Sequence, residues 1–221
     1  MRLPHLPFVK ICCISSLTEA ELATAAGASA IGLVSAMPSG PGVVDEHVIA
    51  EIAAATPPPV SSFLLTAFQN ASDIIKQHQL CRTSTIQLVD HVEPCELELL
   101  REWLPGIKLV QVIHVTGDES VNEAVSVSEY VDAILLDSGN RSLEVKELGG
   151  TGRTHDWTLS RRIRQEIPIP LFLAGGLNAD NVIDAIQTVE PFGLDLCSGV
   201  RTNDKLDEAK LKRFFETIRD L

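Results

Sequence analysis

Short apolar runs alternate with stretches typical of helices along the whole chain. The apolar runs are rich in Val, Ile and Leu, which is typical of buried parallel strands. This pattern predicts strands over residues 8–14, 30–35, 60–66, 85–89, 108–114, 132–137, 170–174 and 193–197. It predicts helices over residues 18–26, 45–55, 71–78, 94–103, 119–128, 157–166, 179–188 and 207–220.

Regular strand–helix alternation indicates a parallel sheet with right-handed crossovers. Eight such units favour a closed (β/α)8 TIM barrel, an α/β fold, over the alternative of a doubly wound open sheet. No linker or low-complexity segment interrupts the pattern, so we expect a single domain over residues 1–221. In the first helix, Thr18 is the expected N-cap, Glu21 completes a capping box, and Gly27 ends the helix.

Composition and charge narrow the possible partners. The chain of 221 residues is 45% hydrophobic and 5% aromatic, with a formal net charge of −12. Such an acidic surface disfavours nucleic acid and anionic membranes, but a small anionic substrate can still bind through local dipoles. No apolar run reaches the length of a membrane span, and no secretory signal begins the chain.

Cysteine usage indicates a reducing compartment. Five cysteines are present, an odd count, and none falls in a CxxC or Cys/His metal spacing. We therefore expect a cytoplasmic protein without a structural metal, whose oligomeric state, monomer or homodimer, the sequence leaves open.

In a barrel of this kind the chemistry lies where strands end, and two ends stand out. Alternation along the first strand turns Lys10 and Cys12 to the barrel interior and Cys13 outward, as a packing thiol. The sixth strand ends in Asp137, opposite the first strand in an eight-membered ring. Cys12 and Asp137 can then face each other across the mouth as a base and an acid. We interpret Cys81, Cys95 and Cys197 as structural.

Glycine-rich turns follow the sixth, seventh and eighth strands. They contribute Gly150, Gly152, Gly175, Gly176, Ser198 and Gly199. Glycines at these places allow backbone N–H groups to approach an anion closely, which predicts a phosphate site, although tight turns alone would also use glycine. The polar residues Gln87, His114 and Asp195 also lie on strands, where structural and substrate-binding roles are both open.

Taken in order, these motifs resemble the phosphoribosylanthranilate isomerase family over nearly the whole chain. The resemblance rests on Lys10-Ile11-Cys12, Gln87-Leu88, Leu136-Asp137-Ser138, the turn at 149–152, Ala174-Gly175-Gly176-Leu177-Asn178, and Asp195 with Ser198-Gly199-Val200.

The resemblance implies an Amadori rearrangement of an N-phosphoribosyl aryl amine to a 1-deoxyribulose phosphate, a step of tryptophan biosynthesis that needs no metal or cofactor. It implies that Asp137 is the general acid that protonates the ring oxygen. It also implies that Cys12 is the general base that removes the C2′ proton, and Lys10 is a candidate to favour the Cys12 thiolate.

Four departures from the family pattern bear on the substrate. The family has Cys-Gly where this chain has Cys12-Cys13, and an arginine that holds the anthranilate carboxylate where this chain has Gly42. Gln-Leu-His-Gly is replaced by the segment 87–90, which ends in Val-Asp, and Ser-Gly-Val-Glu by the segment 198–201, which ends in Arg201. Loss of a charge-assisted pair costs about 1.5–3 kcal/mol of binding energy. Arg201, Arg153 and Arg82 are candidates to replace the missing cation.

Three functional hypotheses follow. The first is the isomerase itself. The second is a paralogue that applies the same acid and base to another phosphorylated sugar adduct. The third is a non-catalytic phosphosugar-binding barrel, which an intact Cys12 and Asp137 disfavour.

Overall fold

The computed structural model describes residues 6–139, 148 and 152–219. Eight parallel strands close into a barrel in the order of the sequence, with β1 hydrogen-bonded to β8, which confirms the predicted (β/α)8 fold. The strands are β1 (Phe8–Ile11), β2 (Ala30–Val34), β3 (Ser61–Thr66), β4 (Thr85–Leu88), β5 (Lys108–His114), β6 (Ala133–Asp137), β7 (Leu171–Leu173) and β8 (Gly193–Leu196).

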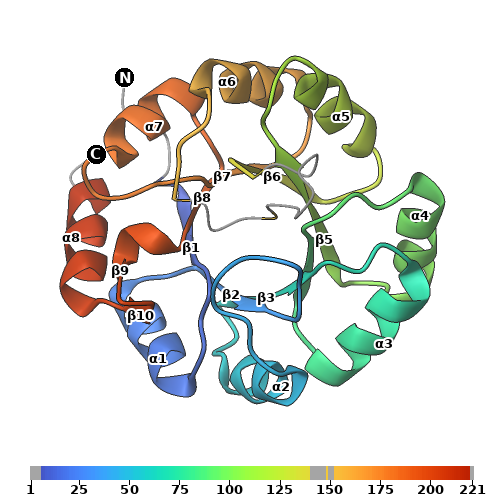
Figure 1. Ribbon diagram of the computed structural model, residues 1–221, viewed down its shortest axis with the longest axis horizontal. Helices are drawn as coiled ribbons and strands as arrows, with labels where there is room; N and C mark the ends of the chain where they lie inside the picture. The colour runs from blue at the N-terminus through green and yellow to red at the C-terminus, as the bar shows by residue number, and fades with distance from the viewer. Residues whose placement is uncertain (1–5, 140–147, 149–151, 220–221) are drawn as a thin grey trace.

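Eight α-helices form a ring around the barrel (Figure 1). They are α1 (Leu17–Ala26), α2 (Glu46–Ala55), α3 (Ala71–Cys81), α4 (Pro94–Trp103), α5 (Glu119–Val127), α6 (Trp157–Glu166), α7 (Val182–Val189) and α8 (Glu208–Arg219). Between β8 and α8 the chain adds a 3-10 turn (Ser198–Val200) and a short hairpin of β9 (Arg201–Thr202) and β10 (Lys205–Leu206). None of the helices in the described residues is long and apolar enough to cross a membrane.

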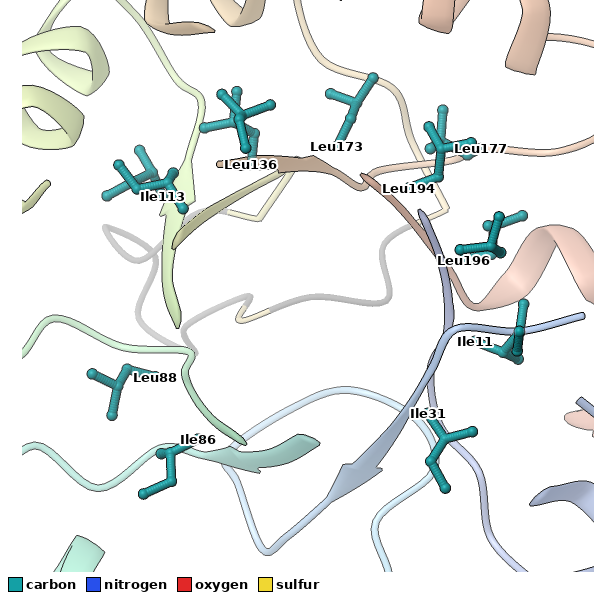
Figure 2. Packing of buried hydrophobic residues seen from close by; sticks show 14 of the residues in the cluster. Ile11, Ile31, Ile86, Leu88, Ile113, Leu136, Leu173, Leu177, Leu194 and Leu196 are labelled. Carbon is teal, nitrogen blue, oxygen red and sulfur yellow. The ribbon is translucent and has the colours of Figure 1, made fainter. Parts of the chain in front are cut away.

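Two apolar clusters line the two faces of the barrel wall. Ile11, Leu136 and Leu196 point away from the ring toward the helices (Figure 2). Their neighbours Val110, Val112 and Leu135 fill the interior. Alternate strand residues face opposite sides of a sheet, so strands buried on both faces are apolar at almost every position.

The strand register places polar residues from neighbouring strands side by side. Lys10 on β1 pairs with Asp195 on β8, and His114 on β5 pairs with Asp137 on β6. The barrel therefore closes between β1 and β8, where the oppositely charged Lys10 and Asp195, far apart in the sequence, lie side by side.

Two sequence-based boundaries at the N-terminal end were wrong. The N-cap of α1 is Ser16, whose Oγ accepts the N–H of Glu19, so the helix begins before Thr18. Strand β1 ends at Ile11, three residues earlier than predicted. Cys13 has a φ of 63°, a left-handed conformation that ends the extended run.

Candidate active site

A cavity of about 690 Å³, including its open mouth, lies at the carboxyl ends of the strands. Several of the predicted site residues line it, namely Cys12, Gln87, Asp137, Asp195, Gly152, Gly175, Gly176 and Ser198. Its position is the one at which barrel enzymes carry their chemistry.

Lys10 lies beneath this cavity and is fully buried. Its Nζ donates to Oδ1 of Asp195 at 2.9 Å and stands 5.4 Å from the ring centroid of Phe63. Burial alone would lower the pKa of Lys10, but the attraction of Asp195 outweighs burial and raises that pKa above its usual range. Lys10 is therefore a fixed positive charge that does not contact the cavity directly.

Asp137 ends β6 and is almost completely buried. Burial raises the pKa of its carboxyl to about 6, and the charge of Asp195 adds to this effect. The N–H of Ser138, which donates to Oδ1 at 2.8 Å, and the charge of Lys10 oppose it. A carboxyl with this pKa is partly protonated near neutral pH, as a general acid requires.

Cys12 and Cys13 both line the cavity, which corrects the expectation that Cys13 faces outward. Because β1 ends at Ile11, the alternation of strand residues no longer applies at Cys13. The Sγ of Cys197, expected to be structural only, lies 2.8 Å from the Sγ of Cys13 and also borders the cavity. Asp195 and Cys197 are two residues apart, so alternation along the predicted eighth strand puts both on one face, and this is the sequence signal for the position of Cys197.

The thiols of Cys12 and Cys13 are not equivalent. A hydrogen bond from the Cys13 thiol lowers the pKa of Cys12; burial opposes this shift and the charge of Lys10 supports it. The hydrogen bonds to Cys12 and Cys197, together with burial, raise the pKa of Cys13 well above its usual range. Cys12 is therefore the thiol that loses its proton first.

The glycine turns after β6, β7 and β8 pack backbone to backbone. A Cβ on Gly176 would lie 2.8 Å from the carbonyl oxygen of Gly152, and one on Gly199 would collide with the carbonyl oxygen of Leu177. Glycine is thus required for the close approach of these loops, and Gly152, Gly175 and Gly176 line the cavity. Gly199 packs against Leu177 without lining the cavity, and Gly150 lies outside the described residues.

Arg201 was expected to contact the substrate, but it does not line the cavity. Its guanidinium donates to Glu19 at 2.9 Å, to the backbone oxygens of Cys12 and Cys13 at 3.1 and 2.6 Å, and to the oxygen of Asp204 at 2.9 Å. These partners occupy the guanidinium on the outer side of β1, so a substrate cannot reach it there.

His114 and Gln87 differ in their relation to the cavity. His114 is buried, with Nε2 3.1 Å from the carbonyl oxygen of Val89, and does not line the cavity. Gln87 lines it, and its buried Oε1 has no hydrogen-bond partner among the described residues. A buried acceptor of this kind is costly unless a ligand or water satisfies it.

None of the described residues that line the cavity is a lysine, an arginine or a histidine. Arg82 is the C-cap of α3, at the end of the barrel opposite to the mouth, and the backbone of Arg153 packs against Gly176. Histidine, cysteine, aspartate and glutamate side chains within the described ranges form no group of three that could hold a metal ion.

Residues 9–217 match the family described as N-(5′-phosphoribosyl)anthranilate (PRA) isomerase. The chain belongs to this family. Among curated members, the N-(5′-phosphoribosyl)anthranilate isomerase 1 of Methanosarcina mazei is 34% identical, with 96% of this chain and 94% of the relative covered. The corresponding enzyme of Methanosarcina acetivorans is 33% identical over 96% of this chain and 92% of the relative. The resemblance found in the sequence is thus confirmed.

Solved structures of PRA isomerases have the same fold. The enzyme of Thermotoga maritima superposes with a TM-score of 0.81 at 29% identity, over 97% of this chain and all of the other. Another PRA isomerase structure, solved with reduced 1-(o-carboxyphenylamino)-1-deoxyribulose 5-phosphate, gives a TM-score of 0.78 at 28% identity, over 97% of this chain and all of the other. These comparisons identify the family and fold without assigning roles to individual residues of this chain.

Proposed function

We propose that the protein catalyses the PRA isomerase reaction, the rearrangement of N-(5′-phosphoribosyl)anthranilate to 1-(o-carboxyphenylamino)-1-deoxyribulose 5-phosphate. The observation that carries the proposal is that Asp137, with a pKa raised to about 6, and Cys12, with a lowered pKa, line one cavity of a chain in this family. A protonated carboxyl and a thiolate are an acid–base pair suited to moving protons on a sugar.

The reaction needs an acid at the ring oxygen and a base at C2′. Asp137 delivers a proton to the ring oxygen, and the amine lone pair opens the furanose to a Schiff base. The Cys12 thiolate then removes the proton from C2′ and gives an enolamine. Loss of the enol hydroxyl proton and protonation of C1′ give the ketone, so two protons enter and two leave without net oxidation.

The walls of the cavity suit the two ends of this substrate. We assign the phosphate to the part of the cavity lined by Gly152, Gly175, Gly176 and Ser198, because glycine turns allow backbone N–H groups to approach an anion. On the side of β2, β3 and β4 the lining residues are mostly apolar, namely Val34, Met37, Pro41, Leu65 and Val89. An aromatic ring fits between such side chains, and the unsatisfied Oε1 of Gln87 is an acceptor for a substrate hydroxyl or amine.

A second candidate follows from Gly42 and from the lack of a cationic side chain among the described lining residues. In it, the same acid and base isomerise a phosphoribosyl aryl amine that lacks the aryl carboxylate. Asp195, Ser39 and the apolar wall then meet a neutral ring, and no carboxylate is left without a partner.

The test compares kcat/KM for N-(5′-phosphoribosyl)anthranilate and N-(5′-phosphoribosyl)aniline, with the product measured by mass spectrometry. Preference for the anthranilate substrate, together with growth without tryptophan of a strain that lacks this isomerase, supports the first candidate. Preference for the aniline substrate without such growth supports the second. Turnover of neither substrate by soluble, folded protein contradicts both.

Variants assign the roles. Asp137→Asn and Cys12→Ser are expected to lower kcat by about 10²–10⁴-fold, because each removes one proton-transfer group. Matched controls are Asp184→Asn and Cys95→Ser, which alter exposed residues outside the cavity. If Asp137→Asn retained more than a tenth of the activity, Asp137 would not be the acid.

A further inference from the structure

Two cysteines meet across the seam between β1 and β8, at which the barrel closes. Sγ of Cys197 lies 2.8 Å from Sγ of Cys13, although the two residues are 184 positions apart in the sequence. Both side chains line the cavity, so small molecules that enter the cavity reach both sulfur atoms. The sulfur–sulfur distance in a disulfide is about 2.05 Å, so a small movement of either side chain would bring these two sulfur atoms to bonding distance.

We propose that Cys13 and Cys197 are a disulfide modification site: a peroxide oxidant links them, and the new bond holds the barrel closed at its seam. All five cysteines of the chain are free thiols in the structure. In a reducing compartment the pair rests as two thiols, and a disulfide there is transient and responds to oxidants. The inference goes beyond the proposed function and does not depend on it, because it involves no substrate.

The backbone around the two cysteines holds their sulfur atoms together. Ile11 pairs with Leu196 in the strand register, and the N–H of Cys12 donates to the carbonyl oxygen of Leu196 at 2.7 Å. Arg201, shortly after β8, donates to the carbonyl oxygens of Cys12 and Cys13 at 3.1 and 2.6 Å. The φ of 63° at Cys13 ends the extended strand there. The ends of β1 and β8 are thus tied together before any bond joins the sulfur atoms.

The third thiol of the cavity, Cys12, lies on the other side of β1. A Cβ on Gly32 of β2 would lie 2.8 Å from Sγ of Cys12 and 3.0 Å from Nζ of Lys10. The sulfur of Cys12 therefore lies next to β2, whereas Cys197 follows β8, and β1 stands between these two strands in the barrel. Cys13 is accordingly the partner for Cys197.

The oxidation balances with one peroxide for each disulfide. Cys197 is partly exposed and Cys13 is buried, so we expect Cys197 to react first. Its sulfur attacks a peroxide oxygen, the O–O bond breaks, and Cys197 becomes a sulfenic acid as one water forms. The sulfur of Cys13 then attacks the sulfur of Cys197, the S–O bond breaks, and the hydroxyl leaves as a second water with the Cys13 proton. The two sulfur atoms lose two electrons, which reduce the peroxide.

The test treats the fully reduced protein with hydrogen peroxide, blocks the remaining thiols by alkylation, and maps its peptides by mass spectrometry without reduction. We expect a cross-linked peptide that joins Cys13 to Cys197 and that dithiothreitol separates. Cys12→Ser should still form it, which assigns the bond to Cys13. The matched control Cys95→Ser, which alters an exposed thiol outside the cavity, should also form it, and Cys197→Ser should not.

Urea denaturation of the oxidised and the reduced protein is the second measurement. A cross-link between residues so far apart restricts the unfolded chain, so we expect the urea midpoint to rise by about 1 M on oxidation. Dithiothreitol should reverse this rise. In Cys197→Ser, peroxide should not raise the midpoint, and Cys13→Ser replaces this variant if it does not fold.

Oxidation confined to Cys12, or separate oxidation of Cys13 and Cys197 to acids without a cross-link, would overturn the inference. A complete disulfide that left the urea midpoint unchanged or lowered it would also overturn it, because the bond would then not hold the seam. Neither measurement uses turnover. A protein that isomerises neither aryl substrate but forms the stabilising disulfide therefore refutes only the proposed function.

Discussion

Two buried ion pairs flank the end of β1, one inside the barrel and one outside. Inside, Lys10 bonds Asp195, and the charges of both act on Cys12 and Asp137. Outside, Arg201 bonds Glu19 and three backbone oxygens. The outer cation is surrounded by its partners, whereas the inner pair borders an open cavity. Similar side chains therefore act inside the wall as charges next to the cavity, and outside it as donors that hold the backbone at Cys12 and Cys13.

Removing the inner cation should have the largest effect on stability. Lys10→Met leaves Asp195 buried without its partner, so we expect the free energy of unfolding to fall by about 3–5 kcal/mol. Urea denaturation measures this loss. The double variant Lys10→Met/Asp195→Leu is the control and should recover most of the loss, because no buried charge remains. A loss below 1 kcal/mol in the single variant would show that Asp195 is not held by Lys10.

The buried Asp137 carboxyl should destabilise the folded protein when it is ionised. Its folded-state pKa of about 6 lies above the ordinary value of 3.8. The protonated carboxyl therefore contributes fully to the free energy of unfolding below pH 3.8, and this contribution is lost as the pH rises through 6. Asp137→Asn is therefore expected to be more stable than the wild type at pH 8, by up to about 3 kcal/mol, and this difference should vanish near pH 4. Denaturant titrations at several pH values measure it. A difference independent of pH would contradict the raised pKa.

The outer cation should give the smallest effect, confined to stability. Arg201→Met removes donors to Glu19 and to the carbonyl oxygens of Cys12 and Cys13, so we expect a loss of about 2 kcal/mol in unfolding free energy. KM should stay within about threefold, because the guanidinium does not reach the cavity. Arg201→Lys, which keeps the charge near Glu19, should lose less. A tenfold rise in KM would place Arg201 at the substrate after all.

The fold could be predicted from the sequence because each element repeats one simple pattern. Strand β5 and helices α4 and α6 have the predicted bounds, since apolar runs and capping signals mark them clearly. The hairpin of β9 and β10 was missed because two-residue strands leave no periodicity to detect.

The candidate site could be predicted only where strand geometry holds. Cys12 lines the cavity, as alternation along the first strand predicted, and Gln87, Asp137 and Asp195 line it from β4, β6 and β8. Cys13 does not follow it, because a left-handed residue after Ile11 redirects the chain, and no residue type signals this turn when glycine is absent.

Arg201 shows a second limit of prediction from the sequence. It directly follows the predicted phosphate turn, but its partner Glu19 lies 182 residues away on α1. Such a pairing depends on the three-dimensional packing of the helices around the barrel. The lack of a cation among the described lining residues could likewise be seen only once Arg82, Arg153 and Arg201 were placed.

The contacts across the β1–β8 seam have a consequence for how the site comes into being. The Lys10–Asp195 pair and the Cys13–Cys197 contact join residues 185 and 184 positions apart. On the ribosome, the first residue of each pair emerges long before the second, so neither contact can form until β8 has been synthesised. Cys12 therefore has its complete surroundings, including the Lys10–Asp195 pair, only once β8 has joined β1 and closed the ring.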